Sequence, residues 1–542
     1  MLNNHNLRLL VFCLACFLSA QAYSISEPAA TEPAATDAVD DVASVVDAHI
    51  RKARHRVGVT PADICSDSEF VRRVYLDIAG RIPTGSERET FLMAPEKNRR
   101  RNLVDSLLES EDYVHHFADM LDVMLMGRGS RRRYEDRVRY HWRDWLETEI
   151  RQNHPWNQMA ARILLARPQT PEDRGAVWFL YERKDDFQKI AEAVSPAFLG
   201  LRIECAQCHD HMVATEIEQQ HYWGLVAFFN RGRNVETDDG PRVAESAIGG
   251  FSDFANLEGS SSPNLLTFFQ STTVKEDRPK PDETQVDGDE MYLEPSIAGD
   301  PRVPRFSRRQ EFVEQILLPH PQLARAFVNR TWAMFMGRGI VHPFDQMDSV
   351  HPPSHPELLD YLAQDFRDSN YDVRRLVRIL VSTQVYQLSS QRPNGAEDPA
   401  TFSWAIERPL SAEQLSRSIQ LSIRGEIHHD MTLLDSLRDK MPAVMPEQSI
   451  TSVSEALYLS NNESLNEFIR SSTKPHHLSS ALLKMQSNEE RIEHLFRTIF
   501  GRSATSEEFA AVSSMLEKDM SAKTLNHVAW AMVTSAEFRF NH

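Results

Sequence analysis

Apolar residues recur at every third or fourth position along most of this chain, which is the spacing of one face of an α-helix. In the stretch FVRRVYLDIAGRIPT, Phe70, Val74 and Ile78 fit a helix that ends at Gly80. Stripes of the same kind continue through both the N-terminal and the C-terminal parts of the chain. The pattern therefore predicts a mainly α fold.

The composition changes between residues 232 and 306, where Gly, Ser, Asp and Pro are frequent. Within this stretch the short runs NLLTFFQSTTV and EMYLEP have β character. We expect a loop-rich linker with a few short strands, which joins one helical domain at 45–231 to a second at 307–542. A chain of 542 residues is also longer than one hydrophobic core usually supports.

The N-terminus has the pattern of a secretory signal. Arg8 precedes the apolar run LLVFCLACFLSA, and Ala20-Gln21-Ala22 offers a small-x-small cleavage site, so we expect a signal peptide at 1–22. This predicts a periplasmic, cell-surface or secreted protein. No later run is apolar enough for a transmembrane segment in the mature chain. The stretch EPAATEPAATDAVDD that follows lacks large apolar side chains, which predicts a disordered tether at 23–44.

The charge balance argues against nucleic acid as a partner. The chain has 60 basic and 78 acidic residues, a net charge of −18, which repels phosphate backbones. The basic run Arg131 to Arg133 is followed by Glu135 and Asp136, a pattern that favours a solvated helix face.

The stretch RIECAQCHDH contains the strongest candidate site. Covalent haem attachment needs two thiols that reach the two vinyl groups and an imidazole that reaches the iron. Positions i, i+3 and i+4 share a face of a helical turn, which brings Cys205, Cys208 and His209 together. The spacing predicts one haem c with His209 as the proximal iron ligand, and His211 is a secondary candidate.

Two other interpretations of the motif stay open. An oxidising compartment also favours a Cys205–Cys208 disulfide. A zinc site needs four ligands, of which His211 or His221 would have to supply some. The third cysteine of the mature chain, Cys65, is expected to be a buried, inert thiol.

Two further sets of residues are expected to be structural. The sequence does not show which residue would be the sixth iron ligand. Four methionines are available, Met124, Met126, Met334 and Met336, but methionines at helical spacing are more often core residues than ligands. In HPPSHPELLDYL, a capping box from Ser354 to Glu357 is favoured over a metal pair of His351 and His355.

The chain resembles a family of exported proteins from planctomycetes and related bacteria. In that family the domain of unknown function 1549, also called the second planctomycete cytochrome-c-type domain, is joined to the domain of unknown function 1553. The resemblance rests on DSEFVRRVYLDIAGRIPT at 67–84 and FLGLRIECAQCHDH at 198–211, and on the long stretch from 323 to 366. It implies export and a haem-like motif, whereas the family's activity is not established.

One local departure concerns the loop after the motif. Relatives usually have Pro followed by an aromatic residue after the position of His211, where this chain has Met212 and Val213. The three expected attachment residues are unaffected.

These observations predict an exported c-type haem protein with an electron-transfer or other redox role and a redox protein as its partner. The alternative is a non-haem exported scaffold, or a polysaccharide-binding or polysaccharide-processing protein, with Cys205 and Cys208 in a disulfide. A third interpretation is a hydrolase with a site that has no sequence motif. The sequence does not decide whether the protein is an enzyme.

Overall fold

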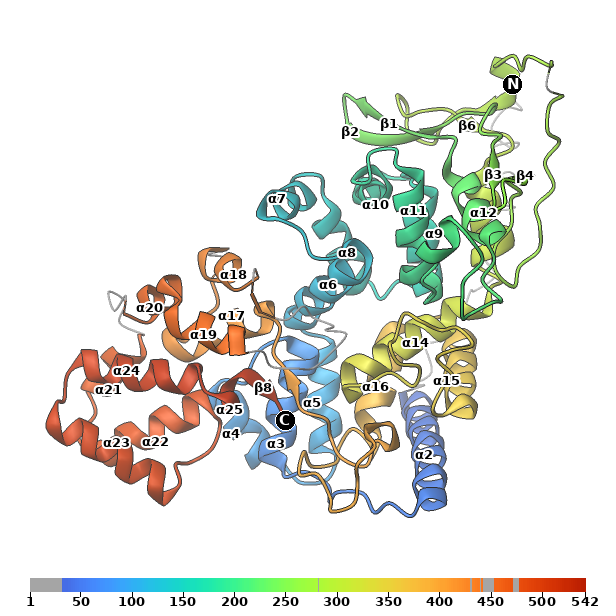
Figure 1. The fold of residues 1–542 in the computed structure, drawn as a ribbon. Helices are drawn as coiled ribbons and strands as arrows, with labels where there is room; N and C mark the ends of the chain where they lie inside the picture. The colour runs from blue at the N-terminus through green and yellow to red at the C-terminus, as the bar shows by residue number, and fades with distance from the viewer. Residues whose placement is uncertain (1–31, 281, 429–430, 439, 442–452, 471–476) are drawn as a thin grey trace, which may run out of the picture.

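The computed structural model describes residues 32–542, except 281, 429–430, 439, 442–452 and 471–476. The fold is mainly α, as predicted (Figure 1). The predicted signal peptide and residues 23–31 of the predicted tether lie outside the described residues. In the described part, no helix combines the length and apolar character that crossing a bilayer requires.

The first part of the chain is a succession of helices with defined ends. Ser66 caps the first turn of the helix predicted around Phe70, and Gly80 ends it in the left-handed conformation, with φ 65°. The elements are α2 (Glu32–Val57), α3 (Asp67–Val74), η1 (Tyr75–Ala79), α4 (Gly85–Met93), α5 (Arg99–Leu108), α6 (Glu111–Met126), α7 (Arg131–Arg139), α8 (Trp142–Arg151), α9 (Trp156–Leu165), η2 (Pro171–Val177), α10 (Trp178–Tyr181), α11 (Phe187–Val194), η3 (Ser195–Leu199), η4 (Glu204–Gln207) and α12 (Gln219–Phe229).

The middle of the chain contains short antiparallel strand pairs, as predicted for the linker. They are β1 (Gly232–Thr237) with β2 (Gly240–Glu245), β3 (Asp253–Ala255) with β4 (Ser261–Pro263), and β5 (Tyr292–Leu293) with β6 (Val303–Pro304); η5 (Asp289–Met291) precedes β5. This segment also packs into the fold, since Leu266, Phe268 and Phe269 are buried in the first apolar cluster. It is therefore not a free connector.

The last part is again helical. Its elements are α13 (Arg308–Glu311), η6 (Phe312–Leu317), α14 (Pro321–Met336), α15 (Pro356–Asp368), α16 (Val373–Ser382), η7 (Pro399–Thr401), β7 (Arg408–Pro409), α17 (Ala412–Arg424), α18 (Met431–Arg438), α19 (Val453–Asn461), α20 (Glu463–Arg470), α21 (Leu478–Leu483), α22 (Asn488–Ile499), α23 (Ser506–Lys518), α24 (Ala522–Val533), α25 (Ala536–Arg539) and β8 (Phe540–Asn541). The capping box predicted at α15 is wrong. The N-cap is His355, and the Ser354 hydroxyl donates to the backbone oxygen of Ile340 at 3.0 Å.

The predicted tether is wrong from Glu32 onward, where α2 begins. Val39, Val42 and Val46 recur at helical spacing, are buried, and pack in the first apolar cluster. The prediction rested on the missing large apolar residues, but valines at the right spacing are enough to bury one face of a helix.

The two hydrophobic cores do not divide the chain at residue 306. The first core extends from Val39 to Phe402 and so includes residues of α14 to α16, whereas the second consists of Leu76 and Ile82 together with residues from Leu410 to Phe538. In Figure 1, α14 to α16 accordingly lie with the first part of the chain, and α17 to α24 form a separate lobe. The predicted domain at 307–542 is therefore divided between the two cores.

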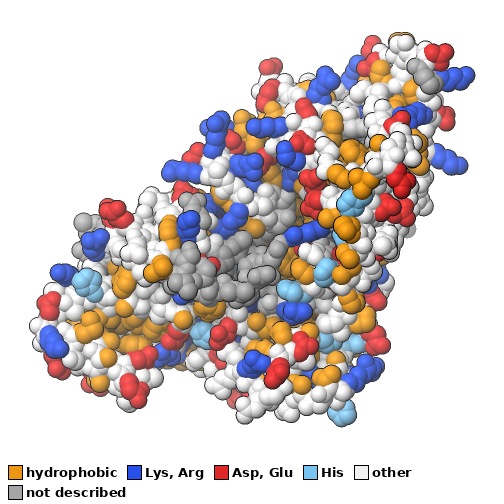
Figure 2. All heavy atoms as spheres, viewed as in Figure 1, with side chains coloured by type: hydrophobic (Ala, Val, Ile, Leu, Met, Phe, Trp, Pro, Cys, Tyr) orange, Lys and Arg blue, Asp and Glu red, His pale blue; other side chains and the backbone are white. Residues whose placement is uncertain are grey.

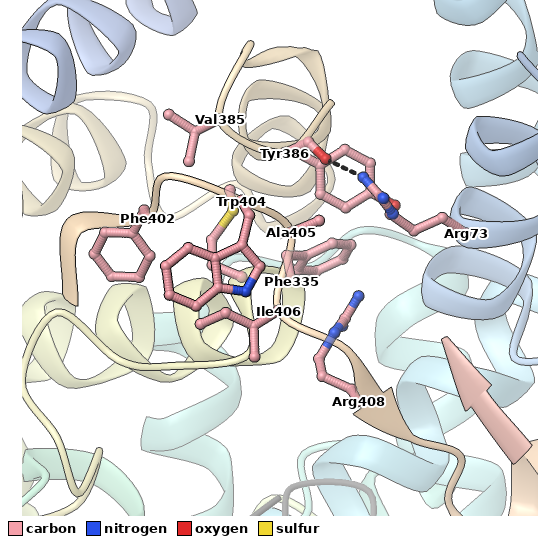
Figure 3. Close-up of a pocket in the computed structure, with 10 residues that line it drawn as sticks. Arg73, Phe335, Val385, Tyr386, Phe402, Trp404, Ala405, Ile406 and Arg408 are labelled. Carbon is pink, nitrogen blue, oxygen red and sulfur yellow. Dashed lines mark hydrogen bonds between the residues drawn. The ribbon is translucent and has the colours of Figure 1, made fainter. Parts of the chain in front are cut away.

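A buried carboxylate, that of Asp77 in η1, links the two cores. It accepts hydrogen bonds from the Tyr386 hydroxyl, the Arg408 guanidinium and the Asn541 amide, each at 2.8 Å. In Figure 3, Arg73 reaches Tyr386, to whose backbone oxygen its Nη1 donates at 2.6 Å. The cavity drawn there measures about 10 Å³, room for about one water molecule. The region is therefore a packed polar junction.

Replacing Asp77 with Ala removes the common acceptor and leaves the mostly buried Arg408 guanidinium without its carboxylate. We expect the protein to lose about 3–5 kcal/mol of stability. Thermal and denaturant unfolding of the purified variant measures this loss. Asp287→Ala, at an exposed linker position, is the control. Equal melting temperatures for the two variants would contradict the linking role of Asp77.

A buried histidine makes the stability of the fold dependent on pH. His116, in α6, is 1% exposed. Burial, followed by the positive charge of Arg417, lowers its pKa from 6.5 to about 3. As the pH falls below 6.5 the unfolded chain binds a proton that the folded protein does not bind. The stability present above pH 6.5 is thus lost progressively down to about pH 3.

We therefore expect the free energy of unfolding to fall by up to about 1.4 kcal/mol per pH unit on account of His116 alone. In His116→Gln the contribution of His116 to the pH dependence of the free energy of unfolding is absent, whatever the stability of the variant at neutral pH. Denaturant titrations from pH 7.5 to pH 4.5 give the slopes, with the exposed residue His527, changed to Gln, as the control. An unchanged slope in His116→Gln would refute this assignment.

Candidate functional site

The segment with the Cys-x-x-Cys-His motif lies between η3 and α12, so it follows one helix and precedes another, as predicted. Gly200 ends η3 with φ 66°. A Cβ at this position would lie 2.8 Å from Sδ of Met347 and 3.0 Å from Cβ of Ala326. Both the backbone conformation and the close approach of the later chain therefore require glycine here.

The two thiols of the motif are accessible. Cys205 lies on the short turn η4 and Cys208 follows it; both are exposed, and neither forms a disulfide. Nδ1 of His209 lies 2.7 Å from the backbone oxygen of Asp210. Because a carbonyl only accepts, Nδ1 carries the hydrogen, and Nε2 of the neutral ring keeps its lone pair. Metal-binding histidines are commonly oriented in this way.

Side-chain and backbone groups in the first turns of α12 anchor the motif segment by hydrogen bonds. The backbone oxygen of Gln207 accepts from Nε1 of Trp223 at 3.1 Å and from the side-chain amide of Gln219 at 3.2 Å. The backbone N–H of Gln219 also donates to the Asp210 carboxylate at 2.8 Å. Residues on both sides of Cys208 and His209 are thus anchored, while the thiols stay at the surface.

The neighbouring histidines stabilise turns. Nδ1 of His211 accepts the backbone N–H of Ala214 at 2.9 Å, and Nδ1 of His221 accepts that of Glu218 at 3.0 Å. An accepting Nδ1 places the hydrogen of the neutral ring on Nε2. Within the part of the chain that the structure describes, no three His, Cys, Asp or Glu side chains are grouped to hold a metal ion. This geometry does not favour His211 as a ligand or the zinc interpretation.

A loop that follows α14 packs on the motif segment, a contact that the sequence does not reveal. The Asp345 carboxylate pairs with Arg202 at 2.8 Å. Ser349 donates to the Glu216 carboxylate from its backbone N–H at 2.7 Å and from its hydroxyl at 2.8 Å. Both sides of the motif are therefore fixed by residues more than a hundred positions later in the chain.

The other sulfur-containing candidates lie in the first core. Cys65 is 3% exposed and forms no disulfide, and burial raises the pKa of its thiol, which fits the expected inert cysteine. The four methionines considered as iron ligands pack in or against the same apolar cluster: Met124, Met126, Met334 and Met336.

Comparison with known families places this site in context. Residues 45–234 match the family PSCyt2, a protein of unknown function (DUF1549), and residues 308–431 match PSD1, a protein of unknown function (DUF1553). The chain joins a DUF1549 domain to a DUF1553 domain. No curated protein and no solved structure matches it. The DUF1549 segment contains the Cys-x-x-Cys-His motif, and the DUF1553 segment contains the loop that packs on it.

Gly200→Ala tests the close packing between the two domains at the motif. The left-handed conformation costs a non-glycine residue about 1–2 kcal/mol, and the new Cβ also collides with Met347. Gly58→Ala is a matched control, since Gly58 has φ 68° and nothing within 4 Å of a Cβ. We expect Gly200→Ala to lower the melting temperature more and to speed proteolysis near Cys205. Equal effects of the two substitutions would contradict the close packing.

Proposed function

We propose that this DUF1549–DUF1553 protein is exported and carries one covalently bound haem in a redox role. The observation that carries the proposal is the arrangement of Cys205, Cys208 and His209. Cys205 and Cys208 are exposed and form no disulfide, and Cys208 directly precedes His209, whose Nδ1 is hydrogen-bonded to a backbone carbonyl. This donor set suits haem attachment, and the cytochrome-like name of the PSCyt2 family agrees with it.

The thiols act as nucleophiles in the attachment. Each S–H adds across a vinyl C=C bond: the sulfur bonds to the carbon next to the ring, and the hydrogen goes to the terminal carbon. The addition forms a thioether and needs no oxidant. Nε2 of His209 would bind the haem iron, and the Asp210 carbonyl orients the imidazole ring. Bound haem supplies one-electron chemistry between the ferrous and ferric states.

The surface position of the motif supports electron transfer to another protein. Besides the exposed thiols, Met212 is 81% exposed and Val213 is 66% exposed. Electron-transfer complexes are small and short-lived, and they need an accessible redox centre more than a deep pocket. A redox protein is therefore the partner that we propose for this surface.

Expression with export, in a host that has cytochrome c maturation genes, tests the proposal. We expect a haem-stained band that survives denaturing electrophoresis, a mass increase of one haem, and a reduced-minus-oxidised spectrum of c type. The double substitution Cys205→Ala, Cys208→Ala abolishes the stain. Cys65→Ala, which removes the buried thiol outside the motif, keeps it.

A correctly exported, folded protein without covalent haem would overturn the proposal. Mass spectrometry under non-reducing conditions then identifies the state of the two thiols. A Cys205–Cys208 disulfide in that product would favour the non-haem scaffold.

A further inference from the structure

A second site lies outside the motif segment. A cavity of about 720 Å³ opens between α6, α7 and α8 on one side and α17 and α18 on the other. Figure 2 shows Lys and Arg side chains gathered over α7, which forms one edge of this cavity. The volume falls within the range of about 300–1,000 Å³ that is usual for small-molecule sites, which are often found between domains. None of residues 200–219 lines it.

The carboxylates of the cavity are paired with arginines. Asp119 in α6 pairs with both Arg143 of α8 and Arg417 of α17, and Arg143 also pairs with Glu147 at 2.7 Å. Among the described residues, every carboxylate that lines the cavity has an arginine within 4 Å. A charged ligand would have to displace one of these partners, which is costly where the pair is buried. The cavity is therefore suited to an uncharged ligand.

Three large, exposed apolar side chains lie on the wall of the cavity. Val138 is 57% exposed, Met431 is 41% exposed and Ile427 is 38% exposed, and all three line it. Large apolar side chains gathered in one hollow, as opposed to scattered over a surface, indicate a binding surface.

A half-exposed imidazole adds a directed hydrogen-bonding group. His115, which is also in the lining, has Nδ1 3.0 Å from a carboxylate oxygen of Glu147. Because the carboxylate accepts, Nδ1 carries the hydrogen, and Nε2 of the neutral ring is an acceptor. The remaining N–H groups of the paired arginines are donors at fixed positions.

We infer that this cavity binds an uncharged carbohydrate, such as a short neutral oligosaccharide. A sugar ring has an apolar face of C–H groups, which suits Val138, Ile427 and Met431. Its hydroxyl groups both donate and accept, so they match His115 and the ion-paired side chains without adding net charge. The inference concerns a different site from the haem motif and does not depend on haem attachment.

Titration of the full exported chain with neutral and charged hexasaccharides tests this inference. The probes are cellohexaose, xylohexaose and mannohexaose, with hexagalacturonate as the acidic counterpart, followed by isothermal calorimetry and saturation-transfer NMR. We expect at least one neutral hexasaccharide to bind, and hexagalacturonate to bind at least about tenfold more weakly.

Met431→Glu places an unpaired charge at the apolar wall, and Met515→Glu is the matched control, since Met515 is 46% exposed and does not line the cavity. We expect the first variant to weaken binding at least about tenfold and the second to leave it unchanged. Val138→Glu repeats the test from α7 if Met431→Glu does not fold. The inference is overturned if no neutral hexasaccharide binds, if hexagalacturonate binds as well, or if the folded wall variants bind like the wild type.

Discussion

The relative position of the two hydrophobic cores depends on one buried carboxylate. Successive residues of the π-helical turn η1 face different surroundings: Leu76 packs in the second core, Ile78 in the first, and Asp77 between them bonds to three partners. Those partners come from the loop after α16 and from the pair β7–β8. A buried carboxylate is stable only when its hydrogen bonds are complete, so this junction requires one arrangement of four distant segments.

Much of the local structure could be predicted from the sequence, because helices follow from residue spacing and from caps that lie within a few positions. The helix that ends at Gly80 is an example. The assignment of α14 to α16 to the first core could not be predicted in this way. Their apolar stripes are those of any amphipathic helix, and a stripe does not specify which partner covers it. The start of α2 was taken for a tether for a different reason, because its sequence has few large apolar residues.

The candidate haem site was found because its signal is local: Cys205, Cys208 and His209 lie within five positions. The residues that fix this segment were missed, because Asp345 and Ser349 contact it only after the chain has passed through the linker and α14. Neither the composition nor the residue spacing of the sequence indicates that positions so far apart are in contact. For the same reason the cavity between α6 and α17 has no sequence motif, since its walls come from both cores.

The two sites differ in what they require of the fold. The motif segment is held by α12 and by the loop after α14, whose flanking helices both belong to the first core. The cavity includes the pair between Asp119 and Arg417, which spans the two cores. A change that lets the cores move apart therefore separates Asp119 from Arg417 and opens the cavity, while the motif segment keeps its contacts. Loosening the junction at Asp77 should therefore change the cavity, and with it the proposed carbohydrate site, while the segment with the two thiols keeps its contacts.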